Sequence, residues 1–499
     1  MSYISIRNNE TIPVSSIPEL DYPGFLELNV LTLHQGPGAH CVNYFGYPHT
    51  GKIKLICCMA QDEDHSINIS SCIIDPEHPL PSFTKHSLIF ERFERELHEN
   101  FGIRYTDHPW LKPVRFPFNR ADKNSSVADY PFFTIESEEL HEVGVGPIHA
   151  GVIEPGHFRF ICNGEQILHL EIQLGYQHRG IESLFLEKKK ILQRITLAEN
   201  IAGDSVAGHT VAFVNLWESL CGFQPGRDLQ FSRTLALELE RIAIHTGDLS
   251  AMCTDVGYQL GNAVFGRLRT PLINYFQIWC GNRLAKGLIR PGYNHFPFSQ
   301  NLADELNQVL NDYEKDFEEM TKELFSLPSA LARFDKTGVV TAEQAESIGT
   351  VGMTARMTGI KKDIRLSHPH DLYPDLSHQP VISNKGDVYA RARLRKKEID
   401  QSIGHIRGLT KNLPHAKHHK GHYTSPSPHC FSISLVEGWR GEVCHCAITG
   451  HNGELMAYKI KDPSFHNWLA LALAVRNNEI SDFPISNKSF DLSYCGHDL

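Results

Sequence analysis

The chain has 499 residues, enough for two to four domains and a large hydrophobic core. Hydrophobic residues make up 41% of it and charged residues 21%, the composition of an ordinary soluble protein. The formal net charge is −10 and no basic stripe stands out. We therefore expect no nucleic acid among its partners, because a nucleic-acid binder presents a basic face.

The twelve cysteines are scattered along the chain. Only Cys57-Cys58 and Cys444-x-Cys446 are close pairs, and no Cys-x-x-Cys occurs. Iron–sulfur and zinc sites need such clusters, so we expect no metal held by this chain. The start, MSYISIRNNETIP, lacks the features of a signal peptide, which together with free thiols indicates the cytoplasm. The longest apolar runs, such as Leu469 to Val475, are too short to cross a bilayer, so membrane association must come through partners.

The first part of the chain alternates strand-like runs with turn residues. The pattern predicts strands over Phe25 to Thr32, Lys52 to Met59 and Ile67 to Ile74. A helix is predicted from about Ser87, because apolar residues recur at helical spacing until Phe101-Gly102 ends it. These elements indicate a small α+β unit.

The charged residues of that helix have two interpretations. They form a partner surface or structural ion pairs, in preference to the alternative of an active site; they are Glu91, Arg92, Glu94, Arg95 and Glu96. The segment from Asn119 to Ser137 is polar and predicts a linker. From Val145 to Phe160 glycine, proline and histidine predict turns and short strands, in which Glu154 and His157 are expected to fix the loop.

Two charged and glycine-bearing patches follow, joined by a long helix-like segment. The first contains His178, Arg179, Gly180 and Glu182, a set that suits proton handling or anion recognition. The alternative is a solvated helix start with an Arg–Glu pair. The second patch, Glu199 to His209, is rich in small residues beside which a partner or cofactor can sit.

Helical periodicity dominates the next part. It predicts long helices over Phe231 to Met252 and Asn301 to Ser326, the second with an acidic, solvated face. Lys411 to His422 gathers four histidines, His415, His418, His419 and His422. Metal binding by this loop is one interpretation and an ordinary hydrophilic loop is the other.

Several of these motifs resemble one family. The string HRG-x-E from His178, the stretch GP-x-H-x-G…EPGHF from Gly146 and E-x-x-RG from Glu437 resemble the large subunit of nickel–iron hydrogenases. The likeness is closest to formate hydrogenlyase of the hydrogenase-4 type and to the hydrogenase-like core subunit of respiratory complex I. The string EREL…FGI…HP from Glu94 resembles the smaller hydrophilic complex I subunit. Fusion of the two modules is the arrangement of formate hydrogenlyase large subunits.

The resemblance implies the fold. We expect an α+β N-terminal domain at residues 1–118, a linker at 119–140, and a mainly α hydrogenase large-subunit-like domain at 141–499. The last would have a helix-bundle core with small peripheral sheets.

The resemblance also implies that the metal centre is lost. In the family two cysteine pairs hold nickel and iron; here these positions are Ala202, Ser205, Ser493 and Gly496, and Cys495 is one residue out of frame. Alanine, serine and glycine cannot supply thiolates. Complex I uses the emptied cavity for a quinone head group, with a tyrosine where this chain has Gly203.

Site residues follow from the same resemblance. The catalytic candidates are His178, Arg179, Glu182, His209 and Asp491, and the expected cavity lining is Gly203, Ser205, Asp363, Arg365 and Arg440. The pair Asp363 and Arg365 would either relay protons or only stabilise the structure of the cavity.

The function implied is that of a core subunit in a membrane-associated, complex-I-like oxidoreductase complex. It would pass electrons from a small iron–sulfur partner subunit to a quinone or another acceptor, with coupled proton transfer. Antiporter-like and other integral membrane subunits would complete the complex on the inner face of the cytoplasmic membrane. The alternative is a structural pseudo-hydrogenase scaffold without chemistry of its own; an active hydrogenase is not expected.

Overall fold

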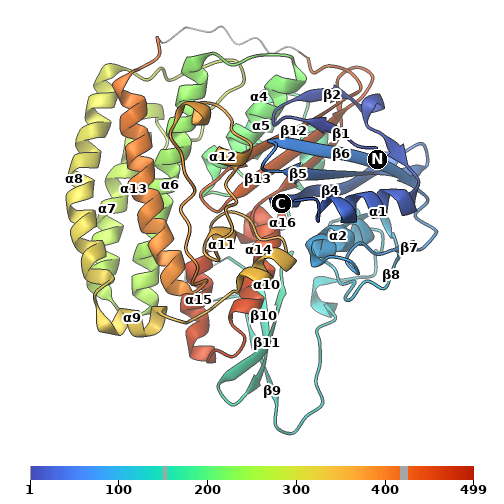
Figure 1. Cartoon of the computed structure of the whole chain (residues 1–499), viewed down its shortest axis with the longest axis horizontal. Coiled ribbons are helices and arrows are strands. Elements are labelled where there is room, and N and C mark those ends of the chain that lie inside the picture. Colours follow the sequence, from blue (N-terminus) through green and yellow to red (C-terminus); the bar gives the residue numbers. More distant parts are fainter. Residues whose placement is uncertain (1, 37, 150–153, 416–424) are drawn as a thin grey trace.

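The computed structural model describes residues 2–36, 38–149, 154–415 and 425–499. The fold is mixed α/β, with long helices gathered on one side of the molecule and the larger sheets on the other (Figure 1). The C-terminal residue Leu499 is buried between these two parts.

The N-terminal sheet has the strand order β1-β6-β5-β4, with the short β3 paired to β6. Its strands are β1 (Ile4–Ile6), β3 (Glu19–Leu20), β4 (Ala39–His49), β5 (Lys52–Gln61) and β6 (Ser66–Ile74). Strands β5 and β6 confirm two of the predicted strands. Helices α1 (Tyr22–Thr32) and α2 (Glu91–Phe101) pack on one face through a cluster that includes Phe25 and Phe93.

The strand predicted over Phe25 to Thr32 is wrong, because this segment is helix α1. Asp21 caps its first turn by accepting a hydrogen bond from Gly24 N at 3.1 Å, and Pro23 stands in that turn. The buried residues Phe25, Leu28 and Thr32 recur at helical spacing. The capping signal outweighs the local strand preference.

Helix α2 is confirmed, and Gly102 ends it with a left-handed φ of 72°. Its charged residues are largely buried. Arg95 bonds Glu91, and Glu96 bonds Arg115 and Lys459. These contacts are the structural ion pairs that were one of the two interpretations of this helix.

After the N-terminal sheet and before the bundle in chain order, an antiparallel sheet is formed by β9 (His141–Val145), β10 (His157–Asn163) and β11 (Gln166–Gln173). It projects at the lower edge of Figure 1. The predicted long helix between the two patches is wrong: it is divided into α3 (Ile181–Glu187) and α4 (Ile191–Ala198). Lys188 and Lys190, in extended conformation, separate the two helices.

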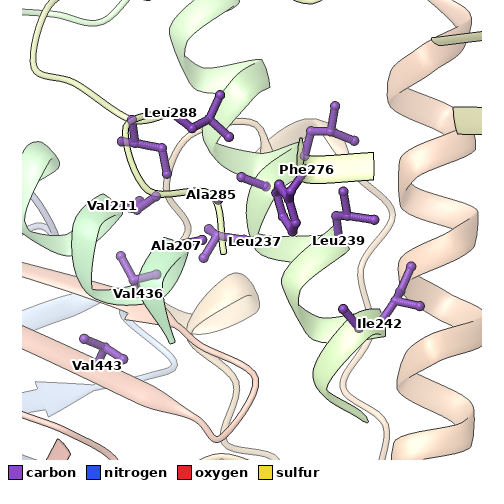
Figure 2. Packing of buried hydrophobic residues seen from close by; sticks show 14 of the residues in the cluster. Ala207, Val211, Leu237, Leu239, Ile242, Phe276, Ala285, Leu288, Val436 and Val443 are labelled. Atoms are coloured by element: carbon purple, nitrogen blue, oxygen red, sulfur yellow. The ribbon is translucent and has the colours of Figure 1, made fainter. Parts of the chain in front are cut away.

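Five helices form the bundle: α5 (Val206–Leu220), α6 (Arg227–Asp255), α7 (Gln259–Cys280), α8 (Gln300–Leu324) and α13 (Val388–Lys411). Helices α6 and α8 confirm the two long predicted helices. Figure 2 shows the apolar packing among them, in which Val211 and Ala207 of α5 lie near Leu237 of α6 and Val436 of β12.

A second sheet has the order β14-β13-β12-β2. It comprises β2 (Thr11–Pro13), β12 (Cys430–Glu437), β13 (Glu442–Thr449) and β14 (Leu455–Lys461). Every residue of β12 and β13 is buried, so this sheet lies inside the molecule and not at its periphery. Its face packs on β4, β5 and β6, and β2 comes from the N-terminal segment. The proposed boundaries at 118 and 140 stay predictions.

The remaining elements are short. They are β7 (Leu80–Pro81), β8 (Tyr105–Thr106), α9 (Pro328–Phe334), α10 (Ala342–Ser347), α11 (Met353–Arg356), α12 (Ile364–Ser367), α14 (Ser464–Ala474), α15 (Phe483–Phe490) and α16 (Tyr494–Asp498). In the described part of the chain, no helix combines the length and the apolar character needed to cross a membrane. His415 is exposed, whereas His418, His419 and His422 lie outside the described residues.

Candidate functional site

A cavity of about 310 Å³ lies where three segments meet: the turn before α5, the β12–β13 turn and the segment that joins α15 to α16. We call it the acceptor cavity. Four predicted positions line it, Gly203, Arg440, Asp491 and Ser493, together with Glu154, Asp204, Asn487, Lys488, Leu492, Tyr494 and Cys495. Charged groups of both signs therefore face a common space.

Arg440 is fixed on one wall of the acceptor cavity. Its guanidinium makes a two-pronged contact with Asp204, with Nη2–Oδ2 at 2.6 Å and Nη1–Oδ1 at 2.9 Å. It also donates to the backbone oxygen of Asp491 and lies 3.9 Å from the centre of the Trp439 ring. These contacts hold the β12–β13 turn against the C-terminal segment.

Asp491 is the titratable group most suited to chemistry in this cavity. It ends α15 in a left-handed conformation, φ 47°, and its carboxylate lies 3.7 Å from Arg440 Nη2 and 3.8 Å from Lys488 Nζ. Burial and the neighbouring Asp248 raise the pKa of Asp491 to about 7. Asp491 can therefore gain and lose a proton near neutral pH.

Asp491 is connected to the interior of the bundle. Asp248 of α6 is the charged neighbour that helps to raise its pKa. Burial opposes ionisation of Asp248, but Arg395 and His245 outweigh burial and lower its pKa. His245 Nδ1 lies 3.8 Å from Asp248, and its Nε2 bonds Glu398 at 2.9 Å. A row of titratable groups thus leads from the cavity to the space between α6 and α13.

The four positions that the resemblance aligns with the cysteine ligands carry small residues, and neighbouring side chains fill part of the space around them. Ala202 and Ser205 are buried, and Ser493 Oγ accepts from Gly496 N at 2.9 Å. A Cβ atom on Gly496 would lie 2.6 Å from Asp462 Oδ2, a distance that real Cβ atoms do not show. Asp462 occupies the space that a side chain at position 496 would need.

His209 belongs to this filled region and does not line the acceptor cavity. It is fully buried, with Nε2 3.0 Å from Asp462 Oδ2 and Nδ1 3.1 Å from His445 Nε2. The contact with His209 helps to lower the pKa of Asp462 against the opposing effect of burial.

The first predicted patch lies elsewhere. His178 and Arg179 line a second cavity of about 580 Å³, together with Ser183 and Glu187. His178 Nδ1 contacts Asp498 O at 2.7 Å, and burial lowers the pKa of His178. Arg179 donates to the backbone oxygens of residues 200, 201 and 495, so it links the two patches.

Glu182 contacts strand β14 of the second sheet. It accepts from Ile460 N at 2.9 Å and lies 3.2 Å from Lys459 Nζ. The structure therefore separates the first patch from Asp491 by the C-terminal segment.

Asp363 and Arg365 lie deeper, outside the lining of the acceptor cavity. They belong to a buried cluster that we call the ionic core: Glu238, Arg241, Arg356, Asp363, Arg365, Glu398 and Glu437. Arg365 Nη2 bonds Asp363 at 2.7 Å, and Arg356 bonds Glu437 at 2.6 Å and Glu398 at 2.7 Å.

Sequence reasoning missed Asp204, Lys488 and Asp248. Asp204 and Lys488 stand within three residues of named site positions, which was an available signal. Asp248 follows Arg241 by seven residues on one helix, a spacing that places both on the same face. Glu154, expected to fix its loop, accepts from Cys495 N at 3.0 Å and also lines the cavity.

Among the residues that the structure describes, no group of three or more His, Cys, Asp and Glu side chains has the arrangement of a metal site.

Two family models match the chain. Residues 28–121 match the model of the respiratory-chain NADH dehydrogenase 30 Kd subunit, and residues 255–432 match that of its 49 Kd subunit. The chain therefore carries domains of both complex I subunit families over these residues. It is similar to hydrogenase-4 component G of Escherichia coli, with 26% identity over 78% of this chain and 67% of the relative.

Other family members are similarly distant. Formate hydrogenlyase subunit 5 of Escherichia coli is 29% identical over 80% of this chain and 74% of its own length. An NADH-quinone oxidoreductase subunit of Phocaeicola vulgatus is 26% identical over 76% of this chain and 79% of its own. The resemblances inferred from the two sets of motifs are therefore confirmed.

Proposed function

We propose that the chain is the core subunit of a complex-I-like, hydrogenase-related oxidoreductase complex and works without a nickel–iron centre. Electrons from an iron–sulfur partner subunit reduce an acceptor, with a quinone as the leading candidate, in the acceptor cavity. Reduction of a quinone to a quinol takes up two electrons and two protons. In this proposal Asp491 delivers protons to the acceptor oxygens.

The residues at the former ligand positions do not fit the nickel–iron centre. Alanine and glycine carry no ligand atom, and the two serine hydroxyls cannot replace the four soft thiolates. Asp462 fills the space beside Gly496, so a cysteine there would not fit without movement. No step of the reaction is assigned to such a centre.

The observation that carries the proposal is Asp491 in the cavity wall, with a pKa of about 7. A general acid works best when its pKa lies near the working pH and its proton reaches the reacting oxygen.

Tyr494 adds support for an aromatic acceptor. This chain has Gly203 where complex I has its tyrosine, but Tyr494 lines the same cavity from the opposite segment. Its hydroxyl is buried and has no hydrogen-bond partner among the described residues. The ring provides an apolar wall for a quinone.

The names of the relatives support the assembly. They include subunits of NADH-quinone oxidoreductases and of a membrane-bound hydrogenase. By analogy we propose a small iron–sulfur subunit as the direct partner, with antiporter-like integral membrane subunits. The chain would then lie peripherally on the inner face of the cytoplasmic membrane.

One observation favours the alternative of a scaffold subunit without chemistry. Part of the former metal site is closed, since Asp462 and His209 fill the space beside Gly496. A scaffold needs no proton donor, whereas the proposed reaction does.

Asp491→Asn distinguishes the two functions. In the complex purified with its iron–sulfur subunit, the clusters are reduced chemically and a soluble quinone analogue is added. We expect the rate of the unmodified complex to decline above about pH 7, and we expect Asp491→Asn to be at least about tenfold slower and to lack this decline. Asp64→Asn, an exposed carboxylate, is the control. Equal rates and equal pH profiles in all three proteins would favour the scaffold.

A further inference from the structure

A third cavity, of about 210 Å³, lies between the N-terminal part of the chain and the hydrogenase-like part. Four segments form it: helix α2, the connection after it, strand β11 and helix α14. We call it the junction pocket. Trp468 stands between it and the acceptor cavity, because its ring contacts that of Tyr494 at 4.8 Å between centres. The two cavities are neighbours with a shared aromatic wall.

The walls of the junction pocket are mostly aromatic and aliphatic. They include Trp110, Tyr130, Phe133, Leu170, Trp468 and Leu469. Phe133 is exposed and lies edge-on to His169, with ring centres 5.6 Å apart. A small apolar cavity with a few polar groups at fixed places is the common form of a small-molecule site.

The two carboxylates in the wall are already paired. Glu91 bonds Arg95 and accepts from Trp110 Nε1 at 2.5 Å. Glu171 bonds Lys112 and accepts from Phe133 N at 2.8 Å. Neither carboxylate is left to neutralise a further cation.

Two guanidinium groups in the wall are left in excess. Arg92 contacts neutral His497 at 2.6 Å and lies 3.7 Å from Glu91, which Arg95 already binds; its Nε has no hydrogen-bond partner among the described residues. Arg476 contacts only His169 Nδ1, at 3.5 Å, and has no ion pair in the described part of the chain. Burial together with nearby Arg95 lowers the pKa of Arg92 to about 10. An anion would relieve this unbalanced positive charge.

We infer that the junction pocket binds a small aromatic monocarboxylate. The ring fits among Phe133, Leu170 and Trp468, and the carboxylate meets Arg92 and Arg476. Guanidinium forks are matched to carboxylates, and an aromatic body suits the aromatic walls. The site is separate from the acceptor cavity and does not depend on the proposed redox function.

Calorimetric titration of the full chain tests this inference with three probes. Benzoate carries ring and charge, benzamide has the same shape without charge, and acetate has charge without a ring. We expect benzoate to bind at least about tenfold more tightly than either of the others. Equal affinity for benzoate and benzamide, or no benzoate binding at millimolar concentration, would overturn the inference.

Variants locate the site. Arg476→Gln alters an exposed side chain and should weaken benzoate binding about fivefold or more without changing benzamide binding. Ala472→Leu fills the pocket and should abolish binding of both ring probes. Arg283→Gln, an exposed arginine outside the pocket, is the matched control. Benzoate affinity that is unchanged in both Arg476→Gln and Ala472→Leu would place binding elsewhere and contradict the proposal.

Discussion

The ionic core and the acceptor cavity are both rich in charged residues, yet they differ in pairing and in access. Arg356 in the ionic core is fully buried and bonds two carboxylates at 2.6 and 2.7 Å. In the acceptor cavity, Asp491 lies 3.7 Å or more from its cationic neighbours, and its side chain is 26% exposed. Charge alone therefore does not mark the site; incomplete pairing beside open space does.

The strongest test of this contrast removes a charge from the ionic core. Arg356→Met removes the ion-pair partner of the buried Glu437 and one of the partners of the buried Glu398, and we expect a loss of about 3–5 kcal/mol in the free energy of unfolding. Denaturant unfolding of the full chain measures this. Arg267→Met is the control, because it breaks an exposed pair worth about 0–1 kcal/mol. Similar losses in both variants would show that the ionic core is not held by its pairing.

A smaller effect is expected from substitutions at Gly496, where the space is filled, and at Gly203, where it is open. Gly496→Ala places a Cβ 2.6 Å from Asp462, and we expect a loss of about 1–3 kcal/mol in the free energy of unfolding. Gly203→Ala faces open space and should change stability by less than about 0.5 kcal/mol. If Gly496→Ala is tolerated as well as Gly203→Ala, then Asp462 does not close this region.

The pH dependence of stability tests the titration of Asp491 in the folded chain. The folded chain holds a proton on Asp491 up to about pH 7, whereas in the unfolded chain this carboxyl ionises at about pH 4. The stabilising contribution of Asp491 is thus full below about pH 4 and is lost as the pH rises toward 7. Asp491→Asn cannot ionise, so we expect its melting temperature to rise relative to wild type between pH 5 and pH 8. A difference that stays constant with pH would mean that Asp491 does not titrate in this range.

Motifs predicted part of this arrangement. The fusion of two modules and the helices α2, α6 and α8 follow from residue strings that are local in the sequence. The prediction that His178, Asp363 and Asp491 share one cavity is wrong, because the position of the C-terminal segment decides which residues line the cavity. Residues 493–499 separate His178 from Asp491, a tertiary feature that no local pattern carries.

Helix α1 was predicted wrongly although its signal is local in the sequence. The sequence carries a local signal for the start of this helix, Asp21 followed by Pro23, and this signal outweighs the strand preference of the residues after it. The division between α3 and α4 was also missed, although consecutive lysines mark the place.

Gly203→Leu tests the central claim most directly. A Cβ at position 203 meets no atom within 4 Å, so a larger side chain can project into the acceptor cavity. Ser183→Leu does the same in the cavity of His178. With chemically reduced iron–sulfur clusters in the purified complex, we predict that quinone reoxidation is lost in Gly203→Leu and retained in Ser183→Leu. Retention in Gly203→Leu with loss in Ser183→Leu would contradict the account and move the acceptor to the cavity of His178.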